Sequence, residues 1–277
     1  RYCVPEPGNR MGDGIKMGLS IGACVAPRSN TLLALGGMLP HDKIGSELFI
    51  LSAMEPVLWI NELGKRFVDE SLNSRDFTAC FNAVRDQQRV YAIVPKSYID
   101  TCVNNGCRMG CPMLNIPAGT KLTNLWAEIE QMQASYPEDV FYCETVSDLI
   151  QGTGTTLPLD AVTTIRMQDT LFKENIDEEY GKDPKYLVPF AEEPCYVFRL
   201  LPAILATPGG LRTTLYACAV DANRNNISGL YAAGNDAGSA TGFTCADGMM
   251  PGFAQGWAVN SGRLAAKEVA FVLGAGP

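Results

Sequence analysis

A helix rich in small residues near the C-terminus limits the folds open to this chain of 277 residues. Residues 252–272 have helical spacing, with Phe253, Trp257 and Leu264 as large apolar side chains. The small residues between them are Gly256, Ala258, Ser261, Gly262, Ala265 and Ala266. Because a glycine in a helix costs roughly 1 kcal/mol relative to alanine, such a helix is expected where its backbone closely approaches a neighbouring element or a cofactor.

The composition argues against several classes of function. Lys and Arg number 22 against 30 Asp and Glu, a formal net charge of -8, and no basic cluster offsets it locally. We therefore expect no nucleic-acid partner. No apolar run approaches the roughly 20 residues that a membrane-spanning helix needs, so no membrane span is expected. The single histidine argues against a histidine-rich zinc site and against a Ser-His-Asp triad.

Three cysteines, Cys102, Cys107 and Cys111, lie within ten residues, and the glycines between them allow the thiols to converge. A Cys-Pro pair at the end of such a run is typical of iron–sulfur ligands, and Cys80 or Cys143 could supply a fourth ligand through space. The alternative is that these are reduced thiols of the core. We adopt the alternative and expect no metal site.

Local patterns predict a mixture of helices and strands. Asp13 precedes apolar residues at helical spacing and is expected to cap an amphipathic helix. Residues 57–68 contain two short apolar runs around a turn and predict a β-hairpin. Short β-rich runs at 213–220 and 230–233 are typical of strands buried in a sheet. The other predicted elements are a strand at 89–94 and helices near 121–135 and 160–180.

Three segments, in this order, resemble the flavoprotein family that includes fumarate reductase, L-aspartate oxidase and the 3-ketosteroid dehydrogenases. They are GDGIKMGLSIGA (12–23), LWINELGKRFVDE (58–70) and SGLYAAGND (228–236). The family also carries a small-residue C-terminal helix with a Gly-Arg-Leu-Ala element, and GRLAA at 262–266 is similar to it. By this ordered set the chain is identified as a member of the FAD-dependent fumarate reductase and succinate dehydrogenase flavoprotein superfamily.

The resemblance implies an α/β fold of mixed α+β character, in which a capping domain is inserted into a Rossmann-like FAD-binding domain. Residues 1–34 and 201–277 would belong to the FAD-binding domain and pack together, and residues 35–200 would form the substrate-capping domain. The GxGxxG motif for the adenine end of FAD does not occur, and the start RYCVPEPGNR has neither an initiator methionine nor a signal-peptide core. We therefore expect a fragment that lacks an N-terminal FAD-binding segment and binds FAD weakly or not at all.

The resemblance also assigns flavin-facing residues. They are Gly12, Asp13, Gly14, Gly234, Asn235, Asp236 and Gly252. Backbone N–H groups at the helix start near Gly252 would stabilise the negative charge of reduced flavin. The family usually carries glutamate where Asn235 stands, so the hydrogen bond to the ribityl chain is expected from Asn235 or from Asp236.

In fumarate reductases an arginine shortly after the Gly-Lys-Arg-Phe turn donates a proton to the substrate, and Arg75 stands at the matching place. Because a guanidinium has a pKa above about 12, such an acid needs an acidic relay. The candidates for the relay are Asp76, Glu47 and Glu55. The alternative is that Arg75 and Asp76 form a solvated ion pair. Arg75 is the candidate catalytic residue.

The substrate-facing candidates are His41, Thr207, Gly209, Gly210 and Cys245. Residues 205–206 are Leu and Ala where fumarate reductases carry a carboxylate-binding histidine, and Cys245 stands near the place of a carboxylate-binding arginine. Losing both anchors removes on the order of several kcal/mol of charge-assisted binding. We therefore expect a larger, more neutral or aromatic substrate rather than a C4-dicarboxylate. His41 is either near this pocket or a solvated loop histidine.

These features predict a FAD-dependent oxidoreductase that transfers hydride between flavin N5 and an activated C–C bond. Its partners would be a small-molecule substrate with a conjugated or activated C–C bond and an external electron donor. The alternative is a non-catalytic substrate-binding or capping module that lacks the adenosine site of FAD. The isolated chain is expected to be inactive.

Overall fold

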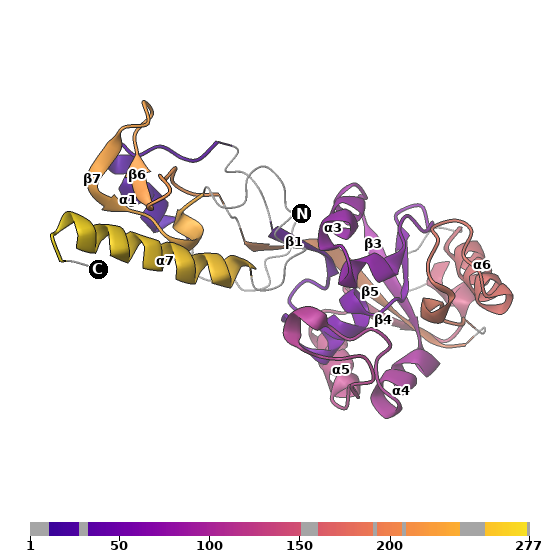
Figure 1. Cartoon of the computed structure of the whole chain (residues 1–277). Helices are drawn as coiled ribbons and strands as arrows, with labels where there is room; N and C mark the ends of the chain where they lie inside the picture. The colour runs from indigo at the N-terminus through magenta and orange to yellow at the C-terminus, as the bar shows by residue number, and fades with distance from the viewer. Residues whose placement is uncertain are drawn as a thin grey trace. The chain divides into compact units, whose positions relative to one another are not determined.

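A computed structural model describes residues 11–27, 33–150, 160–190, 193–206, 209–238 and 253–275 (Figure 1). Within them the chain folds into two compact units. Unit 1 extends from Leu35 to Ala203, and unit 2 combines the described residues up to Ala34 with those from Ile204 onward. The chain passes from one unit to the other within two strands, β1 (Leu33–Met38) and β5 (Cys195–Ala206).

Unit 1 is built on a five-stranded sheet in the order β1-β5-β3-β2, with β4 also paired to β5. The bounds of the other strands are β2 (Leu58–Asn61), β3 (Val90–Pro95) and β4 (Val140–Cys143). β3 is antiparallel to both β2 and β5, with Ala92 opposite Trp59 on one side and Phe198 on the other. β2 and β3 are buried along their whole length, as their apolar, largely β-branched and aromatic residues favour.

Helices complete the core of unit 1. Ala161 and Ile165 of α6 (Asp160–Glu174) join Leu58 and Ile60 of β2 in one apolar cluster. The bounds of the remaining elements are α2 (Glu47–Phe49), η1 (Ile50–Met54), η2 (Glu70–Ser74), α3 (Phe77–Arg85), α4 (Lys96–Asn104), η3 (Pro112–Leu114), α5 (Leu125–Ser135), η4 (Val146–Ile150) and η5 (Pro184–Tyr186).

Unit 2 joins segments from both ends of the chain. Its elements are α1 (Asp13–Ser20), the antiparallel pair β6 (Cys218–Val220) and β7 (Asn226–Tyr231), the turn η6 (Gly234–Asp236) and α7 (Phe253–Val272). Ile15 of α1 and Trp257 of α7 pack against one small apolar cluster that contains Leu211 and Ala219. Segments more than 200 residues apart in sequence therefore share one core (Figure 1).

The mixture of helices and antiparallel strands confirms the predicted α/β class. β3, α5, α6 and α7 lie where the sequence predicted a strand and three helices, although α5 and α6 are shorter than predicted. Among the residues described, no helix is both long and apolar enough to cross a membrane.

The predicted hairpin over residues 57–68 is wrong. β2 pairs with β3 instead, and the chain leaves the sheet after Asn61. The Asn61 side chain accepts hydrogen bonds from the N–H groups of Leu63 and Lys65, at 3.0 and 3.1 Å, and so turns the backbone. Arg66 then forms a buried ion pair with Glu70 in place of continuing a strand.

Two predictions about unit 2 are also wrong. Gly12, with a φ of 69°, is the N-cap of α1, so Asp13 is its first residue and not its cap. β7 is largely exposed, because it belongs to a two-stranded hairpin and not to a buried sheet. The small residues Ala258 and Ser261 of α7 do approach a neighbouring element, the η6 turn, whereas a Cβ atom added to Gly256 or Gly262 would meet no described atom within 4 Å.

Candidate functional site

Two glycine-containing segments of unit 2, both predicted to face the flavin, lie against each other. A Cβ atom added to Gly14 in α1 would lie 2.3 Å from Oδ2 of Asp236 in η6. The absence of a side chain at Gly14 therefore lets the Asp236 carboxylate lie over the start of α1. The structure thus brings residues 12–14 and 234–236 together.

The segment at Gly210 contacts the same place. A Cβ on Gly210 would lie 2.5 Å from the carbonyl oxygen of Asp236, and a Cβ on Gly238 would lie 2.3 Å from the nitrogen of Gly210. The N–H of Leu211 donates to the Asp236 carbonyl at 2.7 Å. Gly209 directly precedes this contact. Two backbone segments thus run side by side, and both need glycine.

α7 fixes the η6 turn through two residues that the sequence did not mark as site residues. The Gly234 N–H donates to Oγ of Ser261 at 2.9 Å, and the Trp257 Nε1–H donates to the Gly234 carbonyl at 3.0 Å. Gly234 has a φ of +59°, and a Cβ there would lie 3.6 Å from Cβ of Ala258. In the sequence, Ser261 could have been identified as a small polar residue within the small-residue helix.

The exposed polar groups of this region suit a nucleotide. The N-cap of α1 is Gly12, which has no side chain to cap the helix, and the first N–H groups of a helix have no partner within the helix itself. Asp13, Asn235 and Asp236 are exposed. Their carboxylate and amide groups have the hydrogen-bonding capacity that sugar hydroxyls require. The residues present therefore fit the polyhydroxyl part of a dinucleotide. Of the predicted site residues, Thr207, Cys245 and Gly252 lie outside the described residues.

In unit 1, Arg75 follows η2 directly, and its guanidinium is held by Asp69. Arg75 Nη2 lies 2.7 Å from Oδ2 of Asp69 and 2.7 Å from Oγ of Ser71. Asp76 has another role, because it caps α3 by accepting a hydrogen bond from the N–H of Ala79 at 2.9 Å. The Arg75–Asp76 pair considered from the sequence is thus replaced by an Arg75–Asp69 pair.

The other two carboxylates considered as relays are engaged elsewhere. Glu47 accepts a hydrogen bond from the N–H of Asn124 at 2.6 Å. Glu55 is fully buried, and it accepts hydrogen bonds from the Tyr98 hydroxyl at 2.5 Å and from the N–H groups of residues 108–110 at 2.7 to 3.0 Å. Asp69, which sequence reasoning missed, is the carboxylate that contacts the guanidinium.

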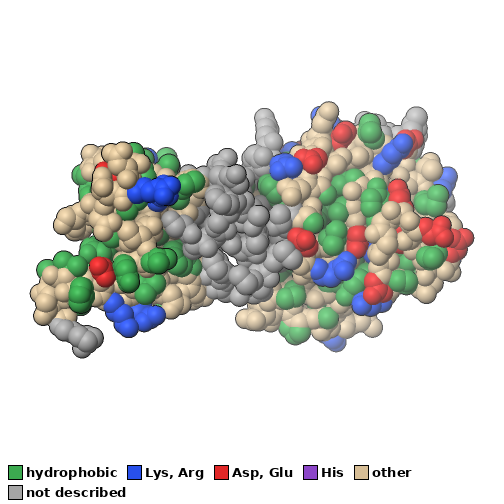
Figure 2. Space-filling model, turned by 45° about the horizontal axis from the view of Figure 1, so that its top comes forward, with side chains coloured by type: hydrophobic (Ala, Val, Ile, Leu, Met, Phe, Trp, Pro, Cys, Tyr) green, Lys and Arg blue, Asp and Glu red, His purple; other side chains and the backbone are tan. Residues whose placement is uncertain are grey.

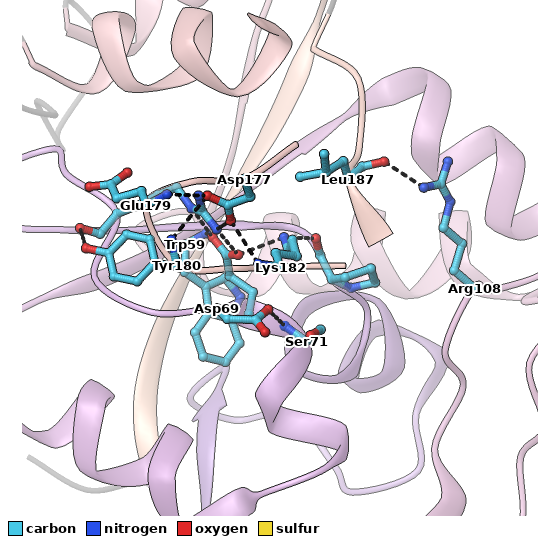
Figure 3. Close-up of polar contacts among 12 residues, drawn as sticks. Trp59, Asp69, Ser71, Arg108, Asp177, Glu179, Tyr180, Lys182 and Leu187 are labelled. Carbon is cyan, nitrogen blue, oxygen red and sulfur yellow. Dashed lines mark hydrogen bonds and ion pairs between the residues drawn. The ribbon is translucent and has the colours of Figure 1, made fainter. Parts of the chain in front are cut away.

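A buried ionic network holds Glu70, the neighbour of Asp69 (Figure 3). Arg66 Nη2 lies 3.0 Å from Oε2 of Glu70 and 2.9 Å from Oδ2 of Asp177. Lys182 Nζ lies 2.7 Å from the same Glu70 oxygen and donates to the Pro56 carbonyl at 2.7 Å. All four charged side chains are buried, and two cations balance two carboxylates.

The four groups of this network depend on one another for their charge. Burial by itself raises the pKa of Glu70, but the Lys182 ammonium and the Arg66 guanidinium outweigh it and hold that pKa below its ordinary value. Burial also opposes the charging of Asp177, yet the hydrogen bond from Arg66 lowers its pKa. For Lys182, burial lowers the pKa in spite of Glu70. Removing one partner would leave uncompensated buried charge.

The sequence profile of the FAD binding domain family matches residues 1–248. The chain belongs to this family. FAD is the cofactor of the FAD binding domain family, and its members related to this chain are FAD-dependent oxidoreductases. The predicted membership of the fumarate reductase and succinate dehydrogenase flavoprotein superfamily is thereby confirmed.

Two curated proteins are similar to this chain of the FAD binding domain family. Vinyl phenol reductase of Lactiplantibacillus plantarum is 34% identical over 278 residues, which cover 98% of this chain and 55% of that protein. 3-Oxosteroid 1-dehydrogenase of Mycolicibacterium smegmatis is 25% identical over 94% of this chain and 46% of that protein. The chain therefore spans about half the length of the curated relatives it matches.

Two solved structures share the fold at 19% sequence identity. The match to the open conformation of a flavocytochrome c3 fumarate reductase has a TM-score of 0.58 and covers 95% of this chain and 42% of the chain in that structure. The match to the 3-ketosteroid delta1-dehydrogenase of Sterolibacterium denitrificans, solved with 1,4-androstadiene-3,17-dione, has a TM-score of 0.59. It covers 96% of this chain and 48% of the chain in that structure. At this identity the likeness concerns the fold alone.

His41 of this flavoprotein lies on an exposed turn with a φ of 68°. Its ring stacks on that of Tyr136, with 4.1 Å between the centroids and 8° between the planes. The next residue, Asp42, is buried, and burial raises its pKa to about 6. A role of His41 toward substrate stays a prediction.

Cys102, Cys107 and Cys111 are buried free thiols. Burial, followed by the nearby charge of Glu55, raises the pKa of Cys102 and Cys107. Because a thiol binds metal as the thiolate, this environment favours the protonated, structural form. Within the described parts of the chain, no group of three His, Cys, Asp or Glu residues is arranged to hold a metal ion.

Proposed function

We propose that the full-length protein transfers hydride between flavin N5 and an activated C–C bond of a small-molecule substrate. The observation that carries this proposal is the contact between Gly14 and Asp236, which joins the two segments that resemble flavin-facing motifs. Membership of the FAD binding domain family and the similarity to vinyl phenol reductase support it.

In this proposal unit 2 is the part of the FAD-binding domain that this chain contains, and unit 1 is the substrate-capping domain. Asn235 and Asp236 hydrogen-bond the ribityl hydroxyls, and the first N–H groups of α1 meet a dipolar or anionic oxygen. Ser261 and Trp257 hold the turn that presents these two side chains. The bound FAD supplies the group that accepts or gives the hydride. Gly252 is proposed to lie at the flavin end of α7.

Arg75 is proposed as the proton donor, presented by the capping domain. Its side chain is 53% exposed, so it is open to a substrate, while Asp69 on its inner side is 8% exposed. The proton that Arg75 gives goes to the substrate carbon opposite the one that receives hydride. The Asp69 carboxylate holds the guanidinium in place through an ion pair and a hydrogen bond.

We assign the substrate to a neutral or aromatic class with a conjugated C=C bond. Leu205 and Ala206 precede residues 207–210, and Cys245 stands near the place of a carboxylate-binding arginine, so neither charged anchor for a dicarboxylate is present in the sequence. The relative with 34% identity is named for vinyl phenol, which has a conjugated C=C bond and no carboxylate. His41 and residues 207–210 remain the candidates for contacts with substrate.

The test uses the full-length protein with FAD bound. The flavin is reduced under anaerobic conditions, and its reoxidation is followed after addition of vinyl phenol or of fumarate. We expect reoxidation by vinyl phenol to be at least about tenfold faster, because a charged dicarboxylate finds no charged partner. Reoxidation by fumarate alone would contradict the substrate class, and reoxidation by neither would contradict the reaction.

The 277-residue chain by itself is proposed to be a capping and substrate-binding module with weak or no affinity for FAD. Unit 2 exposes apolar side chains, among them Leu215 and Phe271. Such side chains are typical of a surface that another segment covers. This supports the proposal that the isolated chain holds only part of the FAD site. Titration with FAD, followed by flavin absorbance after gel filtration, tests it. Copurification of one FAD per chain would show that these residues suffice for the cofactor.

A further inference from the structure

The guanidinium of Arg75 is held in one orientation by two acceptors on the same segment. Nη2 donates to Oδ2 of Asp69 and to Oγ of Ser71, both at 2.7 Å. An amino nitrogen of arginine carries two hydrogens, so both hydrogens of Nη2 are engaged. A proton passed to a substrate would therefore leave from another nitrogen of the guanidinium, on the side away from Asp69.

Asp69 is itself fixed on the other side. Its Oδ1 accepts a hydrogen bond from the N–H of Ser71 at 2.9 Å, as the N-cap of η2, and this leaves Oδ2 for Arg75. The Asp69 side chain is 8% exposed, compared with 53% for Arg75. The carboxylate is thus a mostly buried, pre-oriented partner and not one end of a solvated pair.

The buried ionic network restrains the backbone on which Asp69 lies. Oε1 of Glu70 accepts a hydrogen bond from the N–H of Trp59 at 3.1 Å, and Oε2 lies 2.7 Å from Nζ of Lys182. Lys182 comes from a segment more than 100 residues away in sequence. Figure 3 shows Asp69 with its bond to Ser71 close to this network. The network holds Glu70 inward, and Asp69, the residue before it, is directed to Arg75.

We propose that Asp69 is the positioning residue of Arg75, which holds the guanidinium in the orientation from which another of its nitrogens gives a proton to the substrate. After proton transfer to the substrate, the neutral guanidine takes a proton from solvent at the nitrogen that gave one, and the Asp69 carboxylate stabilises the guanidinium that forms again. One solvent proton is consumed for each proton given to the substrate carbon. This inference rests on the proposed function, since it presumes that Arg75 is the proton donor.

Asp69→Asn tests the role of the charge, because asparagine caps a helix as well as aspartate does and keeps the acceptor for the Ser71 N–H. Asp76→Asn is a matched control: Asp76 is also an N-cap, adjacent in sequence to Arg75, but its oxygen accepts from Ala79. In the full-length enzyme with vinyl phenol, we expect Asp69→Asn to lower kcat by about 10-fold to 100-fold with KM within about threefold. Asp76→Asn should leave kcat within about twofold.

Two further measurements separate proton delivery from a structural role. The solvent deuterium isotope effect on kcat should rise in Asp69→Asn, because proton transfer from a guanidinium that is no longer held in place becomes rate-limiting, and it should not change in Asp76→Asn. In the apoprotein, the Tm losses of Asp69→Asn and Arg75→Lys should be non-additive, because both remove the same ion pair. If Asp69→Asn binds less FAD than the wild type, Asp69→Ser is measured in its place. Serine also keeps the cap, so Asp69→Ser should show the same fall in kcat and the same rise in the isotope effect.

The outcomes distinguish this inference from the proposed function. If Arg75→Lys loses turnover while Asp69→Asn and Asp69→Ser keep it, Asp69 does not position the donor, and the proposed function stands. If Arg75→Lys also keeps turnover within a few-fold, Arg75 is not the donor, and both fail. Additive Tm losses together with an unchanged isotope effect would likewise overturn the role of Asp69.

Discussion

The two units differ in how completely they bury their apolar side chains. In unit 1, large side chains such as Trp59, Phe49 and Phe198 are fully buried. In unit 2, Leu215 is 89% exposed and Phe271 is 78% exposed. Figure 2 shows charged side chains of both signs spread over the unit with the five-stranded sheet, and fewer of them among the hydrophobic side chains of the unit that holds α7.

The exposed fractions of the apolar side chains indicate which unit contributes more to the stability of the chain. A large apolar side chain that stays exposed forgoes about 1.5 to 3 kcal/mol of burial free energy. Apolar contacts within unit 1 therefore stabilise it strongly, and the corresponding contacts within unit 2 are fewer. We expect unit 1 to unfold as a separate and more stable cooperative unit, which hydrogen exchange measured by mass spectrometry resolves.

The largest effect is expected from Glu70→Gln in unit 1. The substitution leaves Arg66 and Lys182 buried without the carboxylate that balances them, and we expect a loss of about 3 to 5 kcal/mol in the free energy of unfolding. Hydrogen exchange should report lost protection in β2 and β3, with α7 unchanged. Asp13→Asn, which removes the exposed Asp13–Lys16 pair of unit 2, is the control without a measurable effect. Equal loss of protection in both units would show that they unfold together.

The next effect concerns the close backbone contact in unit 2. A Cβ at Gly210 would meet the backbone of residues 236–238 at 2.5 to 2.7 Å, and backbone cannot move aside as a side chain can. Gly210→Ala should therefore cost unit 2 about 2 to 3 kcal/mol and leave unit 1 unchanged. Gly14→Ala is the matched control, since its Cβ meets the exposed, movable side chain of Asp236. A similar loss of protection in both variants would contradict this distinction.

A smaller effect, dependent on pH, is expected at Asp42 in unit 1. Burial raises the pKa of Asp42 from 3.8 to about 6, so the folded state favours the protonated carboxyl. The contribution of Asp42 to stability is present below about pH 4 and is lost as the pH rises through about 6. Asp42→Asn, which stays neutral, should therefore stabilise the chain by about 1 to 2 kcal/mol at pH 8 and have little effect at pH 4.

Urea unfolding at the two pH values measures the effect of Asp42→Asn. The control is Asp86→Asn, because Asp86 is exposed and paired with Arg85, so its removal should show no such pH dependence. An effect of Asp42→Asn that is equal at both pH values would exclude the buried charge as its cause.

The smallest effect is expected from Gly262→Ala in α7. A Cβ there meets no described atom within 4 Å, so the higher helix propensity of alanine should raise the stability of the 277-residue chain by about 0.5 to 1 kcal/mol. Ser261→Ala, which removes the acceptor for the Gly234 N–H, should instead lower it. Thermal unfolding measures both. If the gain disappears in the full-length protein, another segment approaches α7 closely there.

The candidate site was only partly predictable from the sequence. The motif at Gly14 and the turn at Asp236 were both marked by their resemblance to known segments, and the structure places them in contact. Arg75 was marked by its place after a motif, but its partner was sought among Asp76, Glu47 and Glu55. Asp69 was missed because it lies inside the motif itself and because nothing in a sequence shows to which side a carboxylate turns.

The sequence alone sufficed to predict the family, the α/β class and the elements whose signals are local, such as β3 and α7. Those signals depend on neighbours a few residues away, through side-chain periodicity and turn residues. The pairing of β2 with β3 and the contact of Arg66 with Asp177, 111 residues away, became visible only in the three-dimensional fold. Such partners are set by the path of the whole chain, because a buried charge or strand edge is satisfied by whichever group packing brings to it.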